Sequence, residues 1–169
     1  KRVQDEIDYK FRITEENIVL ELEMNGIIEQ VEVEKNYDDD LGVKFVEMTI
    51  RSCANDCVFC FVDQNPPNMR KGMYFRDGDY RMSYLHGHYI TMTNMGQNDL
   101  ERIIDQRLSP LYISIHVTDQ KLRQKLFLYK KDDKLLDKIE FLTKNGIELH
   151  SQIVLMPDIN DGEYLLQTL

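Results

Sequence analysis

The chain has 169 residues, 42% of them hydrophobic, and a formal net charge of -9. This length suits one domain, or a small domain and part of another, and the hydrophobic content argues against global disorder. The negative balance disfavours non-specific nucleic-acid binding, because phosphate backbones attract basic surfaces. No apolar run reaches the roughly 18 residues that span a bilayer. We therefore expect no membrane partner and a cytoplasmic location.

Residues 1–46 behave as one unit in the sequence pattern. A short helix is predicted over about residues 4–13. Apolar residues then alternate with glutamates on both sides of Asn25-Gly26, which is a strong signal for a tight hairpin. A helix and one hairpin are too little for a stable domain, and no signal segment or initiator Met precedes them. We expect the chain to be truncated at both ends.

From residue 47 onward the pattern predicts strands that alternate with helices. A strand over residues 45–50 leads into a cysteine-containing loop, and residues 61–88 are predicted to be a long ordered loop. Strands follow at 89–93, 111–117 and 149–155, separated by amphipathic helices, and a last helix starts after Asp161-Gly162. This alternation predicts an α/β fold with parallel strands, of which four βα units form an incomplete (βα) barrel.

All three cysteines lie within eight residues, with the spacing Cys53-x-x-x-Cys57-x-x-Cys60. An odd, clustered set indicates metal or redox chemistry in a reducing compartment rather than a disulfide scaffold. Three thiolates on one loop can hold three corners of a [4Fe-4S] cluster and leave the fourth iron open to a small molecule. A dithiol pair, or a structural zinc site with His86 or His88 as fourth ligand, is the alternative.

This spacing, with Phe59 before the third cysteine and the loop after the first strand, resembles the radical S-adenosylmethionine (SAM) superfamily. The resemblance implies a [4Fe-4S] cluster on Cys53, Cys57 and Cys60, SAM as cofactor, an external one-electron donor and an unknown substrate. Phe59 would pack near the adenine. The carboxyl ends of later strands offer further cofactor contacts, namely Thr93, Asn94, Ser114 and Gln152.

One departure concerns the second strand end, where the superfamily often carries a Gly-Gly-Glu segment for the SAM amino group. This chain has Thr91-Met92-Thr93-Asn94 there, and Thr93 and Asn94 are positional substitutes. His116 ends the third strand. It could act in the active site, or it could be a structural histidine whose ring is hydrogen-bonded at the strand end. The charged residues of the long loop, such as Arg76, Asp77 and Arg81, fit either a lid over an anionic ligand or a loop held by ion pairs.

The resemblance can be narrowed by four stretches, Cys57–Gln64, Tyr74–Arg81, Tyr89–Asn94 and Leu111–His116. They are similar to an uncharacterised bacterial family that joins an N-terminal PDZ-like domain to a radical SAM core and a C-terminal domain of unknown function. Residues 1–46 resemble the second half of the PDZ-like domain, and residues 47–169 the first part of the barrel. This implies a peptide or protein partner. The alternative function is a PDZ-like peptide-binding adaptor with a structural zinc or vacant cysteine site.

Overall fold

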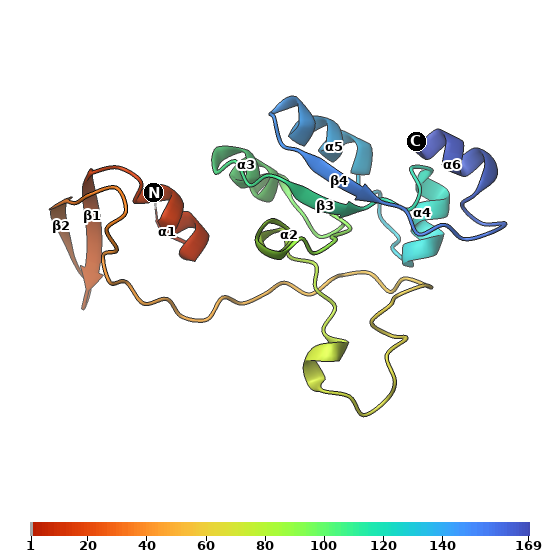
Figure 1. Cartoon of the computed structure of the whole chain (residues 1–169), viewed down its shortest axis with the longest axis horizontal. Helices are drawn as coiled ribbons and strands as arrows, with labels where there is room; N and C mark the ends of the chain where they lie inside the picture. Colours follow the sequence, from red (N-terminus) through yellow and green to blue (C-terminus); the bar gives the residue numbers. More distant parts are fainter. Residues whose placement is uncertain (1) are drawn as a thin grey trace. The chain divides into compact units, whose positions relative to one another are not determined.

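The computed structural model of the chain describes residues 2–169 and divides into two compact units, one ending at Thr49 and the other running from Ile50 to Leu169. The described residues contain short α-helices, one 3-10 helix (η1) and two small two-stranded sheets, so the fold is mixed α/β (Figure 1). The elements are α1 (Glu6–Arg12), β1 (Asn17–Met24), β2 (Ile27–Glu34), η1 (Lys71–Tyr74), α2 (Tyr80–His86), α3 (Gln97–Asp105), β3 (Leu111–Ser114), α4 (Gln120–Phe127), α5 (Leu135–Lys144), β4 (Leu149–Gln152) and α6 (Gly162–Thr168).

The first unit contains the predicted helix and hairpin. Asp5 caps α1 by accepting a hydrogen bond from the Asp8 main-chain N–H. β1 and β2 pair antiparallel, and the register closes at Met24 opposite Ile27. Asn25 and Gly26 between them have φ angles of 52° and 79°, which Asn and Gly adopt at least cost. The prediction from Asn25-Gly26 is therefore confirmed.

The hairpin leaves much of its apolar surface uncovered. Leu22, Met24 and Ile27 project from the same face, because cross-strand partners and alternate residues share a side. The exposed fractions are 43% for Leu22, 63% for Met24 and 71% for Ile27. The core of this unit is therefore small.

The second unit is built on parallel strand pairing. β3 and β4 lie side by side in parallel, with Leu111 opposite Leu149 and Ser114 opposite Gln152 (Figure 1). A single parallel bridge between Ile90 and Ile113 continues this order on the other side of β3. The predicted strand over residues 89–93 is thus reduced to one bridge, but its parallel direction and its place next to β3 are as expected.

The core of the second unit lies around this sheet. Fully buried side chains come from the strands and from the helices on either side, and they include Tyr80, Ile90, Ile103, Leu111, Ile113, Phe127 and Leu142. α5 ends at Asn145, and Gly146 follows with a φ of 80°, so the predicted stop at Asn145-Gly146 is confirmed. From Ile90 to Leu169 the structure therefore has helices and strands in the order that the sequence predicted.

Two predictions for the segment before Ile90 were wrong. Residues 45–50 are not a strand, because they have no strand beside them to pair with; pairing begins only at the Ser52–Asp77 bridge. Residues 61–88 are not one long loop, since they contain η1 and α2. α2 begins at Asp79, whose carboxylate accepts from the Arg81 main-chain N–H, and ends at Gly87 with a φ of 71°. These caps permit a seven-residue helix where apolar periodicity is weak.

No helix within residues 2–169 is both long enough and apolar enough to cross a membrane.

Candidate functional site: the cysteine loop and the strand ends

The first part of the cysteine loop is paired with the segment before α2. The Cys53 N–H donates to the Arg76 carbonyl at 2.6 Å, and the Gly78 N–H donates to the Arg51 carbonyl at 3.0 Å. The two segments approach so closely that a Cβ on Gly78 would lie 2.7 Å from Cys53 Cα and 2.9 Å from its N. Only glycine fits at residue 78, because both atoms belong to the main chain.

The middle of the loop is tied to the end of α4. The Asp56 N–H donates to the Phe127 carbonyl at 3.1 Å, and the Val58 N–H donates to the Leu126 carbonyl at 3.0 Å. These carbonyls belong to the last turn of α4 and have no acceptor role within the helix. Cys57 lies between the two donors in sequence, so the helix end fixes the main chain on both sides of this residue.

Arg76 adds a third attachment. Its guanidinium donates to the Asn55 carbonyl at 3.0 Å and to the Asp56 carboxylate at 2.9 Å. It also bonds both carboxylate oxygens of Asp63, at 3.1 and 2.5 Å. A planar guanidinium suits such multiple contacts. Because Asn55 and Asp56 precede Cys57 and Asp63 follows Cys60, Arg76 links the segments on either side of the turn from Cys57 to Cys60.

The three thiols are close enough to influence one another. Burial, together with the negative charges of Cys53 and Cys60, raises the pKa of Cys57 to about 12. A positively charged metal centre reverses this preference, since thiolate and not thiol binds metals. Among residues 2–169, however, no group of three or more His, Cys, Asp or Glu side chains is gathered closely enough to hold a metal ion. Three thiols are nevertheless a donor set whose chemistry fits an iron–sulfur cluster.

The predicted contacts at the second strand end divide into two kinds. The Asn94 amide donates to the Ser52 carbonyl at 3.2 Å and to the Gly78 carbonyl at 3.1 Å, so it supports the loop. The Thr93 hydroxyl lies 3.0 Å from that of Thr91, which accepts from the Asn55 amide at 2.8 Å. Thr93 is thus joined to the cysteine loop through Thr91 and Asn55.

Asn55 is a site residue that the sequence did not single out. Its side chain is buried, and its Oδ1 has no hydrogen-bond partner among the described residues. A buried acceptor without a partner is costly in a folded protein. Asn55 lies between two cysteines in an unperiodic segment, so no sequence signal distinguished it from an ordinary loop residue.

The remaining predicted contacts surround the third strand end. Ser114 is buried at the end of β3, and Gln152 is its exposed partner on β4. The Phe59 and His116 rings pack edge to face with their centres 4.7 Å apart. The centres of the Phe59 and Phe127 rings are 6.1 Å apart. Phe59 therefore packs between the cysteine loop, the end of β3 and α4, while Gln152 belongs to the neighbouring, open part of the sheet edge.

His116 is fixed by main-chain contacts in an unusual conformation. Its φ is 59°, its Nδ1 accepts the Val154 N–H at 3.0 Å, and its carbonyl accepts from the Asn160 amide at 2.8 Å. Burial and the positive charge of Arg123 lower the pKa of His116 to about 4. The ring is therefore neutral at neutral pH, and its single proton is on Nε2 because Nδ1 is the acceptor.

Arg123 is the second site residue that the sequence did not reveal. It is 3% exposed, and its Nε donates to Asp133 at 2.6 Å. Its other donors go to the carbonyls of Thr91, Ser114 and Ile115, which lie at two adjacent strand ends. In the sequence Arg123 is one of several basic residues on an amphipathic helix, so nothing indicated that it is buried.

The charged residues around the long loop are held by ion pairs, as one of the two sequence interpretations proposed. Arg81 pairs with Asp79 at 2.6 Å, and the His88 Nδ1 lies 2.5 Å from the Asp77 carboxylate. The rings of His86 and His88 are 5.8 Å apart, centre to centre. Asp79 also accepts the Arg51 main-chain N–H at 3.0 Å, so this segment is tied to the start of the cysteine loop.

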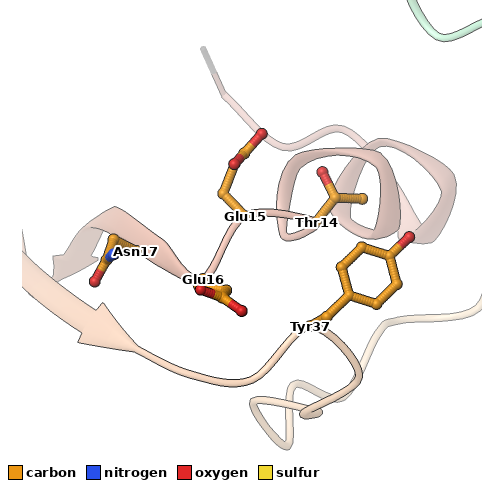
Figure 2. Close-up of a pocket in the computed structure, with 5 residues that line it drawn as sticks. All are labelled: Thr14, Glu15, Glu16, Asn17 and Tyr37. Atoms are coloured by element: carbon orange, nitrogen blue, oxygen red, sulfur yellow. The ribbon is translucent and has the colours of Figure 1, made fainter.

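A separate, shallow pocket of about 550 Å³ belongs to the first unit (Figure 2). The Tyr37 ring, from the segment after β2, lies across from Thr14, in the segment after α1, in this view. The lining residues are Thr14, Glu15, Glu16, Asn17 and Tyr37. None of them is a predicted site residue, and two exposed carboxylates in an open pocket indicate no particular ligand.

Comparison with known families gives one result that covers most of the chain. Residues 35–169 match the model of a family described as the Radical SAM-like domain. The chain therefore belongs to this family. Searches of curated proteins and of solved structures found no match.

Proposed function

We propose that this protein is a radical SAM enzyme whose Cys53, Cys57 and Cys60 hold a [4Fe-4S] cluster. The observation that carries the proposal is the loop itself. Its three thiols lie within eight residues, and its main chain is attached to the segment before α2, to α4 and to Arg76. When bound, such a cluster supplies one electron for reductive cleavage of SAM at an iron that has no protein ligand.

The residues of the chain would bind and orient this cofactor. Three soft thiolates suit iron, and the anchored main chain limits how far each ligand can move. Phe59, with His116 and Phe127 behind it, offers an aromatic surface for the adenine. Thr93, Asn94, Ser114 and Gln152 are proposed as further cofactor contacts. In this assignment Asn94 acts through the loop it supports, and Thr93 through the hydroxyl pair with Thr91.

The larger architecture is part of the same proposal. Parallel pairing of Ile90, β3 and β4 supports an incomplete (βα) barrel over residues 47–169, with the site at the carboxyl ends of the strands. We propose that residues 1–46 are part of a PDZ-like domain that binds a peptide or protein partner. An external one-electron donor and a substrate of unknown class complete the reaction, and the cytoplasm is its proposed location.

Anaerobic reconstitution with iron and sulfide tests the ligand assignment. We expect close to four iron and four sulfide per wild-type chain, loss of most of this uptake in Cys57→Ala, and full uptake in the matched control Val58→Ala. Val58 is an exposed neighbour whose main-chain bond to Leu126 survives the substitution. Production of 5′-deoxyadenosine from SAM after dithionite reduction is the second measurement. Stoichiometric zinc binding without iron uptake would favour the alternative, an adaptor with a structural zinc site.

A further inference from the structure

Arg123 carries a permanent positive charge into the interior of the second unit. An arginine side chain remains protonated in proteins, and Arg123 is 3% exposed. Its ion pair with Asp133 at 2.6 Å is buried on both sides. Solvent screens such charges weakly, so their effect on a neighbouring redox centre is larger than that of surface charges.

The helix that holds Arg123 is also the helix that holds the cysteine loop. The carbonyls of Leu126 and Phe127 accept from the main chain on either side of Cys57. The guanidinium carbon of Arg123 lies 4.3 Å from the centre of the Phe127 ring. Phe127 therefore connects the buried cation with the main chain of the ligand loop.

Two groups of α4 that carry opposite charge, the helix end and the Arg123 guanidinium, thus act on the loop. The carboxyl end of a helix carries a partial negative charge, and here it is in contact with the residues next to Cys57. Addition of one electron to a cluster bound at this loop increases the negative charge, and the helix end opposes that change. A buried cation on the same helix favours it, and cluster potentials respond to net charge of this kind.

We propose that the Arg123–Asp133 pair sets the reduction potential of the cluster bound by the cysteine loop. Arg123 stabilises the reduced state, and Asp133 moderates this effect. The step is the gain of one electron from an external reductant, with no proton and no bond change. The inference rests on the proposed function, because it concerns a cluster on Cys53, Cys57 and Cys60.

The test is a potentiometric titration of the reconstituted holoprotein with dithionite. The EPR signal of the reduced cluster measures the reduced fraction at each potential. We expect Arg123→Gln to lower the equilibrium constant for reduction at least tenfold, which is about 59 mV for one electron. Asp133→Asn should shift the potential in the opposite direction. The double variant R123Q/D133N should return toward the wild-type value, because the net charge of the pair is again zero. Arg123→Lys keeps the charge and should remain within about threefold of wild type.

Lys125→Gln is the matched control on the same helix. Its side chain is exposed, so the loss of one positive charge there should change the equilibrium constant less than threefold. Wild-type iron and sulfide content and an unchanged circular dichroism spectrum are required of each variant. If Arg123→Gln does not fold, the sign of the potential shift in Asp133→Asn tests the inference. That variant keeps the Arg123 cation and its contacts with the carbonyls.

Two results would overturn the inference while leaving the proposed function intact. One is a wild-type potential in both Arg123→Gln and Asp133→Asn; the other is a shift of the same sign in both. Failure of the wild-type protein to take up a cluster would instead overturn the proposed function, and the inference with it.

Discussion

The two units of the chain differ in how well their apolar side chains are buried, although both bury charged groups, Asp8 and Lys35 in the first and Arg123 in the second. In the first unit the apolar side of the hairpin is largely exposed, and an ion pair such as Lys10–Glu6 lies at the surface. In the second unit a charged side chain, Arg123, is buried and hydrogen-bonded to strand-end carbonyls. Burial of charge is tolerated only where partners are complete. The second unit therefore has a core able to support a site, whereas the first unit contributes little stability of its own.

The largest expected effect tests this difference in the two cores. Leu142 is 0% exposed, whereas Leu22 in β1 is 43% exposed. We expect Leu142→Ala to lower the free energy of unfolding by about 2–5 kcal/mol, because it removes buried apolar area and leaves a cavity. Leu22→Ala should cost less than about 1 kcal/mol. Urea unfolding of the full chain measures both, and equal losses would show that the hairpin is as well packed as the second unit.

The buried histidine predicts a pH dependence confined to the second unit. Its pKa is lowered to about 4 from an ordinary value of 6.5, so the unfolded chain takes up the proton first as pH falls. The stability due to neutral His116 is thus complete above pH 6.5 and is lost between pH 6.5 and 4, by up to about 3 kcal/mol.

His116→Asn is the control for this prediction. Asparagine supplies an acceptor in place of Nδ1 and tolerates a positive φ. Thermal unfolding of wild type and variant between pH 7 and 4 should therefore differ in slope. A wild-type slope retained in His116→Asn would assign the pH dependence to other groups.

The close approach at Gly78 predicts a third effect. Gly78→Ala places a Cβ against the main chain of Cys53, which cannot move as a flexible side chain would. We expect a loss of about 1–3 kcal/mol together with reduced iron uptake. Gly72→Ala is the matched control, because a Cβ there meets no atom within 4 Å and the residue is not among those with positive φ. Equal iron uptake by both variants would show that the close approach of Gly78 to Cys53 is not needed for the loop to bind iron.

The smallest effect belongs to the hairpin turn. Gly26 has a φ of 79°, and nothing lies within 4 Å of a Cβ built there, so Gly26→Ala tests main-chain strain alone. We expect a cost of about 1–2 kcal/mol. Hydrogen exchange of the β1 amides should accelerate while that of β3 is unchanged. Faster exchange in β3 as well would show that the two units unfold together.

These elements also show what the sequence could predict. The hairpin at Asn25-Gly26 and the end of α5 at Gly146 follow from local turn chemistry, and parallel pairing of β3 with β4 follows from the alternation of strands and helices. The strand at 45–50 could not be excluded, because its pattern is that of a strand and only the absence of a neighbour prevents pairing. α2 was not predicted, because its capping residues and tertiary contacts, rather than apolar periodicity, define it.

The candidate site divides in the same way. The spacing predicted the three cysteines as cluster ligands, the resemblance assigned Phe59 to the adenine, and both assignments stay predictions. The supporting residues Asn55, Arg123 and Phe127 act through burial and through main-chain carbonyls. Such contacts depend on which distant segments meet in the fold, and residue type and spacing carry no information about them. Asn94 was found by its position at a strand end, but its contacts support the loop.

We propose above all that the cysteine loop holds a cluster with one iron open to SAM. The most direct measurement is the EPR spectrum of the anaerobically reconstituted, dithionite-reduced protein with and without SAM. We predict the signal of a reduced [4Fe-4S] cluster whose g values shift when SAM is added, and loss of that signal in Cys57→Ala. A reduced-cluster spectrum that SAM leaves unchanged, or no cluster at all, would contradict the account.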